Sequence, residues 1–179
     1  MTLALERKKV IVTGGSRGIG RATVLRLAAM GAHVLFSYRS DEDAARAVEA
    51  EVREMGGQAL GVQADLSVLA DLQRLFAVIP ERFGGRPDAY IGNAFPAAVF
   101  MPTAIMTENG YDGLFAAVRG HYFALQQAAL SVNDGGSSIV LSSGAAAQPQ
   151  PASGAYAGAK AAVERFALSL ASWGTAASR

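Results

Sequence analysis

The sequence predicts an α/β fold in one domain, with a doubly wound parallel sheet at its centre. Short apolar segments rich in β-branched residues alternate along the chain with longer segments of helical pattern. The length of 179 residues and the 51% hydrophobic content fit one sizeable core, and no linker interrupts the alternation. Because strands that alternate with helices are joined by right-handed crossovers, we expect a parallel sheet with helices on both faces.

Five strands and five helices are expected, each strand followed by a helix. The strands are Lys9 to Thr13, Ala32 to Tyr38, Ala59 to Ala64, Asp88 to Gly92 and Ser138 to Ser142. The helices are Ile19 to Met30, Asp41 to Met55, Ser67 to Phe83, Gly110 to Val132 and Gly154 to Trp173. Asp41 is a favourable N-cap, Pro80 weakens the third helix, and Gln148 to Ser153 is expected to be a loop.

The composition argues against several classes of function. A formal net charge of +1, with acids and bases interspersed, gives no broad field for nucleic acid or an anionic membrane. The absence of cysteine excludes disulfides and thiol catalysis and fits a reducing compartment, so the cytoplasm is the expected location. No segment resembles a secretion signal or a membrane span. His33 and His121 lack metal-ligand spacing, so we expect structural roles for them and no metal site.

A glycine-rich turn, TGGSRGIG from Thr13 to Gly20, separates the first strand from the first helix. Gly14 permits a tight turn, Gly18 lets a pyrophosphate approach the backbone, and Gly20 lets the helix pack closely on the sheet. The helix N-terminus would then face the phosphates. The turn predicts a Rossmann-like dinucleotide site that includes Gly14, Ser16, Arg17, Gly18, Ile19 and Gly20. The alternative is a structural turn without a ligand.

The end of the second strand bears on the choice of cofactor. An acidic residue there would accept hydrogen bonds from the adenosine ribose and repel a 2′-phosphate. The sequence has Tyr38 and then Arg39 instead, and Arg17 lies within the glycine-rich turn. Guanidinium groups suit phosphate, so the sequence predicts NADP, with NAD the less favoured cofactor. The alternative is that both arginines are solvated surface residues.

Three further residues predict a catalytic site. Tyr156 and Lys160 lie one turn apart at the start of the last helix, and Ser143 ends the fifth strand. All three are expected at the carboxyl edge of the sheet, beside the glycine-rich turn. A YxxxK pair alone is common and can be a surface pair. Together with the TGxxxGxG turn and the spacing of the serine, however, it resembles the short-chain dehydrogenase/reductase family of the classical type.

The resemblance implies hydride transfer between a nicotinamide cofactor and a ketone or secondary alcohol. Reduction of a carbonyl builds negative charge on oxygen, which requires a proton donor and a second hydrogen bond. By resemblance, Tyr156 is the acid/base, Lys160 favours its phenolate form and binds the nicotinamide ribose, and Ser143 orients the carbonyl. The GGSRGIG and YRSDED segments look like the branch that contains bacterial 3-oxoacyl-carrier-protein reductases.

Two more positions match the family in part. Asp65, with Leu66 beside it, resembles the aspartate that contacts the adenine ring; its alternative is an ordinary helix cap. Asn93, in IGNAF, matches the family's NNAG signature, and its alternative is a simple turn residue. Gly92 and Phe95 depart from that signature, since an asparagine and a glycine are usual at these positions.

Other departures leave the function open. Ala117 stands where the family carries an asparagine that supports a water relay to the lysine, and Gly120 supports this register. The chain lacks a counterpart of the family's last one or two strands, so an exposed sheet edge is expected. The family's pairing of helices across a two-fold axis implies a homo-oligomer. Two alternatives to the enzyme are a nucleotide-binding protein without turnover and a truncated product of a longer reductase.

Overall fold

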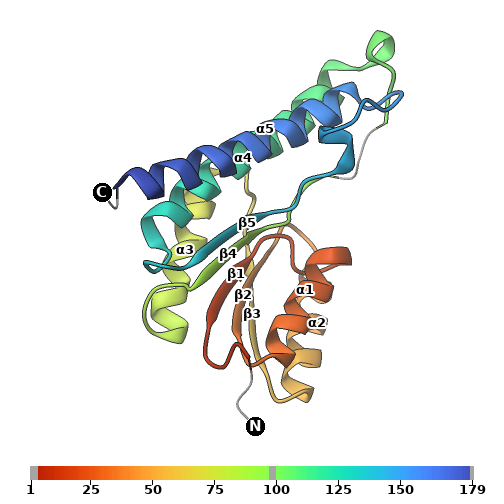
Figure 1. The fold of residues 1–179 in the computed structure, drawn as a ribbon. Coiled ribbons are helices and arrows are strands. Elements are labelled where there is room, and N and C mark those ends of the chain that lie inside the picture. The colour runs from red at the N-terminus through yellow and green to blue at the C-terminus, as the bar shows by residue number, and fades with distance from the viewer. Residues whose placement is uncertain (1–3, 97–99, 178–179) are drawn as a thin grey trace.

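The structure, a computed structural model, describes residues 4–96 and 100–177. Within them, five parallel strands form one sheet in the order β3-β2-β1-β4-β5 (Figure 1). The strands are β1 Lys9–Val12, β2 His33–Tyr38, β3 Gln58–Gln63, β4 Ala89–Gly92 and β5 Ser137–Val140. Each predicted strand coincides with one of these and differs at an end by one or two residues. The predicted α/β class with a parallel sheet is confirmed.

The helices also follow the predicted alternation. They are α1 Gly18–Ala29, α2 Glu42–Glu54, α3 Leu69–Phe83, α4 Glu108–Ser131 and α5 Gly154–Ala177, with 3-10 turns η1 Thr103–Ile105 and η2 Gly144–Ala146. Asp41 caps α2 by accepting from the Ala44 N–H at 3.0 Å, as its sequence position predicts.

Three helix boundaries differ from the prediction by two residues or more, namely the starts of α3 and α4 and the end of α5. The α4 helix begins at Glu108 rather than Gly110, because the Thr107 hydroxyl caps it by accepting from the Gly110 N–H at 3.1 Å. The α5 helix continues to Ala177 rather than ending at Trp173. Gly174 directly after Trp173 is a typical helix stop, but the helix passes through it, and two alanines near its end favour its continuation.

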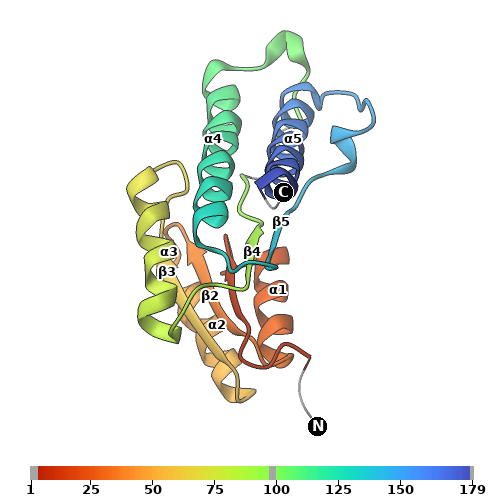
Figure 2. The same cartoon turned by 60° about the vertical axis from the view of Figure 1, so that its left-hand side comes forward.

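The helices form two layers, one on each face of the sheet (Figures 1 and 2). Along β1, Val10 and Val12 point to the core shared with α1 and α2, whereas Ile11 points to the core shared with α3 and α4. This alternation follows from the two-residue period of a strand. Helices α4 and α5 lie side by side (Figure 2) and enclose a third, smaller core of Leu114, Val118 and Ala159.

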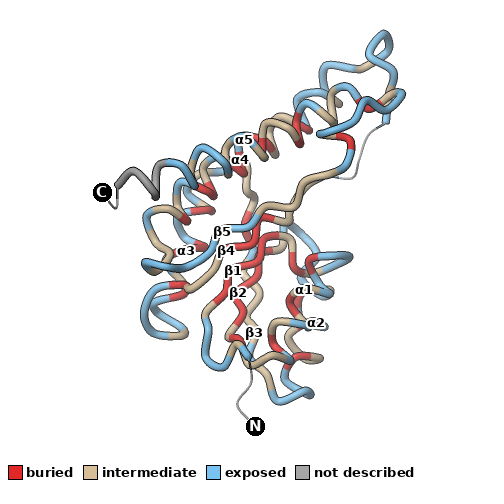
Figure 3. Tube along the Cα trace, in the orientation of Figure 1, coloured by how far each residue is buried: buried red, intermediate tan, exposed pale blue. Residues whose placement is uncertain are grey.

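Burial falls from the centre of the sheet toward β5 (Figure 3). Strand β1 is almost entirely buried, whereas most of β5 is exposed and Ile139 retains 49% of its accessible surface. The exposed sheet edge that the sequence predicts is therefore present at β5. An open edge of this kind presents unpaired backbone groups to solvent.

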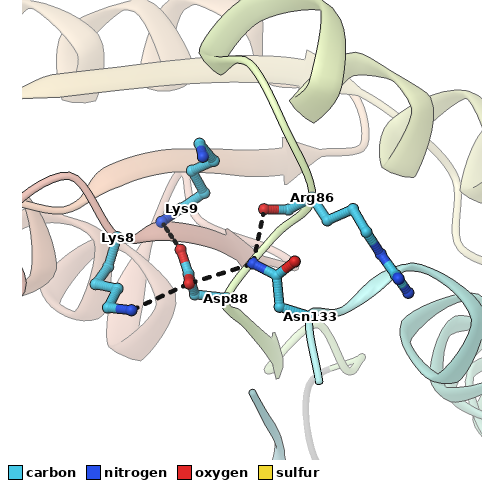
Figure 4. Close-up of polar contacts among 5 residues, drawn as sticks. All are labelled: Lys8, Lys9, Arg86, Asp88 and Asn133. Carbon is cyan, nitrogen blue, oxygen red and sulfur yellow. Dashed lines mark hydrogen bonds and ion pairs between the residues drawn. The ribbon is translucent and has the colours of Figure 1, made fainter. Parts of the chain in front are cut away.

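A polar cluster at the amino edge of the sheet joins segments distant in the sequence (Figure 4). One carboxylate oxygen of Asp88 accepts from the Lys9 N–H at 2.9 Å, and the other accepts from Lys8 Nζ at 3.2 Å and Asn133 Nδ2 at 3.4 Å. Burial raises the pKa of Asp88, but these hydrogen bonds outweigh it and leave the pKa below its ordinary value. The cluster holds the starts of β1 and β4 to the turn before β5, opposite the carboxyl edge.

Candidate active site

The glycine-rich turn lies between the end of β1 and α1. Gly14 and Gly18 have φ values of 68° and 55°, in the left-handed region that glycine adopts without strain. A Cβ on Gly20 would lie 2.0 Å from the Gly14 carbonyl oxygen, so only glycine lets the helix pack this closely on the turn. A Cβ on Gly18 would meet nothing within 4 Å. The turn therefore packs closely against the rest of the protein at Gly20, and its exposed side at Gly18 is open.

Strand β4 fixes the turn through Asn93. The Asn93 side chain donates to the carbonyl oxygens of Thr13 at 2.9 Å and Gly14 at 3.0 Å. In return, the buried Thr13 hydroxyl accepts from the N–H groups of Asn93 at 3.0 Å and Ala94 at 3.1 Å. Asn93 thus fixes the turn, and its predicted contact with the cofactor stays a prediction. Thr13 was not predicted as a site residue, although a hydroxyl at the end of a buried strand is a usable signal.

The residues predicted to contact the adenosine end lie at the neighbouring strand ends. Arg17 is the N-cap residue of α1 and Arg39 follows β2, and both side chains are exposed. One oxygen of Asp65 accepts from the Ser67 N–H at 2.9 Å and hydroxyl at 2.7 Å. These two bonds and the nearby charge of Arg39 lower the pKa of Asp65. Asp65 is therefore ionised at neutral pH, with part of its carboxylate already engaged in a turn.

Lys160 lies buried at the carboxyl end of β5. Its side chain is 4% exposed, and Nζ donates to the Leu141 carbonyl oxygen at 2.8 Å. The ammonium also lies 3.9 Å from the centre of the Phe95 ring. Burial lowers the pKa of Lys160. The lysine is thus withdrawn from solvent and fixed by contacts from two other segments.

Tyr156 lies one turn before Lys160 on α5 and is half-buried. Its ring makes an edge-to-face contact with Phe95, with centroids 5.9 Å apart, and a tilted contact with Phe100 at 5.7 Å. Phe95 therefore touches both members of the YxxxK pair.

Ser143 lies three residues after the end of β5 and caps η2, where its Oγ accepts from the Ala145 N–H at 3.3 Å. Because that bond uses an oxygen lone pair, the hydroxyl proton remains free to donate. The adjacent Ser142 donates to Glu164 of α5. This bond and the Lys160 bond to Leu141 attach α5 to the two consecutive residues that follow β5. The structure thus brings Ser143 and Lys160 to one corner of the sheet, as the spacing predicts.

His121 of α4 lies beneath this corner. It is buried, and its Nε2 donates to the Ala94 carbonyl oxygen at 2.8 Å. A carbonyl only accepts, so this bond identifies the tautomer that carries its proton on Nε2. Burial lowers the pKa of His121 to about 4. The predicted structural role agrees with this contact, but its position beside the site had no signal in the sequence.

The helix that carries Ala117 packs closely against the segment after β3. A Cβ on Gly120 would lie 2.7 Å from the Leu66 carbonyl oxygen, so glycine is required for the approach of α4.

In the described residues, no group of three or more His, Asp or Glu side chains is arranged to hold a metal ion. None of the helices described is long and apolar enough to cross a membrane.

Comparison with known proteins agrees with this geometry. The model of the short chain dehydrogenase family matches residues 8–174. A hydroxynaphthalene reductase-like protein of Metarhizium brunneum is 36% identical over 170 residues, which cover 94% of this chain and 63% of that protein. A 1-cyclohexenylcarbonyl-CoA reductase of Streptomyces collinus is 34% identical over 168 residues, which cover 93% of this chain and 59% of that protein. The chain therefore spans about three fifths of the length of these relatives.

Solved structures give the same result. A short chain dehydrogenase from Burkholderia cenocepacia, in complex with NADP, superposes with a TM-score of 0.82 and 33% identity, over 89% of this chain and 65% of that one. A putative dehydrogenase from the same organism, with bound NADP, superposes with a TM-score of 0.90 and 29% identity, over 98% of this chain and 67% of that one. From the family match, the identities and the fold together, the chain belongs to the short-chain dehydrogenase family.

Proposed function

We propose that the chain is an NADP-dependent oxidoreductase that transfers hydride between NADP(H) and a ketone or secondary alcohol. The observation that carries the proposal is the burial of Lys160 at the end of β5, one helical turn from Tyr156 and next to the segment of Ser143. A buried amine with so few hydrogen-bond partners is typical of functional sites. The names of the relatives, which are reductases, support the reaction class.

The residues around the glycine-rich turn fit a dinucleotide phosphate. The turn is open at Gly18, and the N-terminus of α1 offers unpaired N–H groups to an anion. Arg17 and Arg39, both exposed, would bind the 2′-phosphate. Nearby, Asp65 already accepts two hydrogen bonds from Ser67, and the Asp41 carboxylate caps α2. The NADP found with two neighbouring structures supports this choice.

Bound NADPH would supply the hydride. The side chains of this protein would then stabilise the negative charge that develops on the carbonyl oxygen of the substrate. The Tyr156 hydroxyl would donate its proton to that oxygen, while the hydroxyl proton of Ser143 would give the second hydrogen bond. The positive charge of Lys160 would stabilise the tyrosinate that remains until solvent returns the proton. In the oxidative direction the same groups act in reverse.

The test is NADPH oxidation by the purified chain with a panel of carbonyl compounds. The panel contains aromatic ketones, aliphatic ketones and a 3-oxoacyl thioester, since the sequence resembles the branch with 3-oxoacyl reductases. Tyr156→Phe should bind NADPH like the wild type and lose about 100-fold or more in kcat. Binding of NADPH without turnover of any compound would reject the enzyme and favour a nucleotide-binding protein without catalysis.

A further inference from the structure

Phe95 occupies the position where the family signature carries glycine, and its ring fills the space between α4, α5 and the end of β4. The ring contacts Lys160 at 3.9 Å, His121 at 5.8 Å and Tyr156 at 5.9 Å, measured to or between ring centroids. It packs against the small core of α4 and α5. No other aromatic ring of the described residues contacts both Tyr156 and Lys160.

The Lys160 ammonium is held from two directions. Its three N–H groups require partners because the side chain is almost fully buried. One donates to the Leu141 carbonyl oxygen, and the face of the Phe95 ring offers its negative quadrupole to a second. One N–H therefore remains for a ligand, and its direction is set by the other two contacts.

We propose that Phe95 is the positioning residue for Lys160 and Tyr156: its ring holds the buried ammonium over its face and packs edge-to-face with the tyrosine. The kinetic consequence of this contact rests on the proposed reductase function, but the contact itself does not. A glycine at this position would leave the ammonium without its second partner. The cation–π contact offsets part of the burial that lowers the pKa of Lys160.

The groups around Lys160 identify Phe95 as the source of this effect. From α4, His121 faces the site and is neutral above about pH 4 because burial lowers its pKa. From α5, Glu164 already accepts a hydrogen bond from Ser142, and Tyr156 is the other titratable neighbour. The end of β5 contributes only the neutral Leu141 carbonyl. Neither Glu164 nor any other carboxylate of the described residues forms an ion pair with Lys160, so the ring is its principal favourable neighbour besides that carbonyl.

The composition of the chain makes the contact directly measurable. The sequence has three lysines, and Lys8 and Lys9 lie at the opposite edge of the sheet. Protein labelled with ¹³C-lysine therefore gives three sets of side-chain NMR signals, and Lys160→Arg assigns one of them. In the wild type, the Hε protons of Lys160 should be displaced upfield of those of Lys8 and Lys9 by the ring current of Phe95. Absence of this displacement would overturn the proposal without any variant.

Three variants then test the role of the ring. Phe95→Leu, apolar and of similar size, should abolish the displacement and lower the pKa of Lys160 further in an NMR titration. Phe95→Tyr should retain both properties. The matched control Phe100→Leu removes the other ring on Tyr156 and should leave the Lys160 signals unchanged. Unchanged signals and an unchanged Lys160 pKa in Phe95→Leu would contradict the proposal.

Kinetics give a second readout that separates this proposal from the proposed function. With a ketone that the wild type reduces, Phe95→Leu should lose about twofold to thirtyfold in kcat with little change in KM, and its rate should fall at a lower pH than that of Phe95→Tyr. An equal rate and an equal pH profile would show that the ring does not position the lysine. If the wild type reduces no ketone, the proposed function fails, while the NMR measurements still decide the role of Phe95.

Discussion

His121 is one of two buried bases that contact the Phe95 ring, and its charge state follows from its surroundings. Its pKa is lowered to about 4 by burial, against about 6.5 for an ordinary histidine. As the pH falls below 6.5, the unfolded chain binds this proton and the folded chain does not. His121 therefore removes stability progressively between about pH 6.5 and pH 4, by about 3 kcal/mol in total.

The corresponding prediction concerns His121→Gln. Glutamine can still donate to the Ala94 carbonyl oxygen but does not titrate, so its free energy of unfolding should fall less steeply between pH 7 and pH 4. Urea denaturation at a series of pH values measures this slope. His33→Gln is a companion variant: burial also lowers the pKa of His33, so this variant should make the fall less steep as well. Equal slopes for wild type and His121→Gln would show that His121 does not titrate as described.

A second prediction concerns Arg39 and the binding of the cofactor. It is exposed after β2, and its charge contributes to the lowered pKa of Asp65. Arg39→Glu replaces a phosphate partner by an acid, so NADPH should bind about tenfold or more weakly while NADH binds as well or better. Titration of nicotinamide fluorescence measures both affinities. Arg82→Glu, an exposed arginine at the far end of α3, should change neither, and a loss of NADPH binding there would undermine the assignment.

The sequence predicted these residues to different degrees. Ser143, Tyr156, Lys160 and the glycine-rich turn were identifiable because their spacing along the chain is itself informative. The contacts of Phe95 with Lys160 and of His121 with Ala94 were not, because each joins residues far apart in the sequence. Only the packing of α4 and α5 against the segment that follows β4 brings them together. Thr13 was missed although its place at the end of a buried strand is a usable signal, because its partners are backbone N–H groups far along the chain.

Among the elements, α1 depends most closely on a single residue. A Cβ on Gly20 would overlap the Gly14 carbonyl oxygen and the Asn93 side chain, so Gly20→Ala must displace the helix or the turn. We expect a loss of about 2–4 kcal/mol in the free energy of unfolding, together with weaker NADPH binding. Thermal unfolding and a cofactor titration measure the two effects.

Gly113→Ala provides the control for that change. Gly113 lies within α4, and a Cβ there would meet nothing within 4 Å. Alanine should therefore stabilise the protein by up to about 1 kcal/mol, through helix propensity alone. If Gly20→Ala had the same free energy of unfolding as Gly113→Ala, α1 would not pack on the turn as closely as described.

The elements themselves were largely predictable, and their ends were not. Buried strands such as β1 appear in the sequence as continuous apolar segments. The N-cap of α2 is likewise identifiable from Asp41. The start of α4 was misplaced because Thr107 is one of several polar residues that could cap it. The start of α3 at Leu69 is later than predicted, since Asp65 and Ser67 form a turn before the helix.

For the whole molecule, the parallel sheet brings the segments of the proposed site to one edge. The glycine-rich turn, Asn93 and Ser143 follow β1, β4 and β5, which are adjacent in the sheet order. Carboxyl ends of parallel strands meet at one edge, so a site there follows from the topology. The hydrogen bonds of the Asp88 cluster join the strands at the opposite edge. They therefore do not occupy the carboxyl edge, where ligands would bind.

The exposed β5 edge was the other feature of the whole molecule that the sequence predicted. The prediction came from comparison with the length of the family fold, and the burial of the strands agrees with it. Since the chain spans about three fifths of the relatives' length, the activity of those proteins is a proposal for this one.

The most direct measurement is the transfer of deuterium to a ketone of the panel from NADPH that carries deuterium at both hydrogen positions of its reactive carbon. The account predicts that the wild-type chain forms an alcohol with one deuterium per NADPH oxidised, and that Tyr156→Phe binds NADPH but forms about 100-fold less. An unlabelled alcohol, or tight NADPH binding with no alcohol from any ketone, would contradict the assignment of this chain as a hydride-transferring reductase.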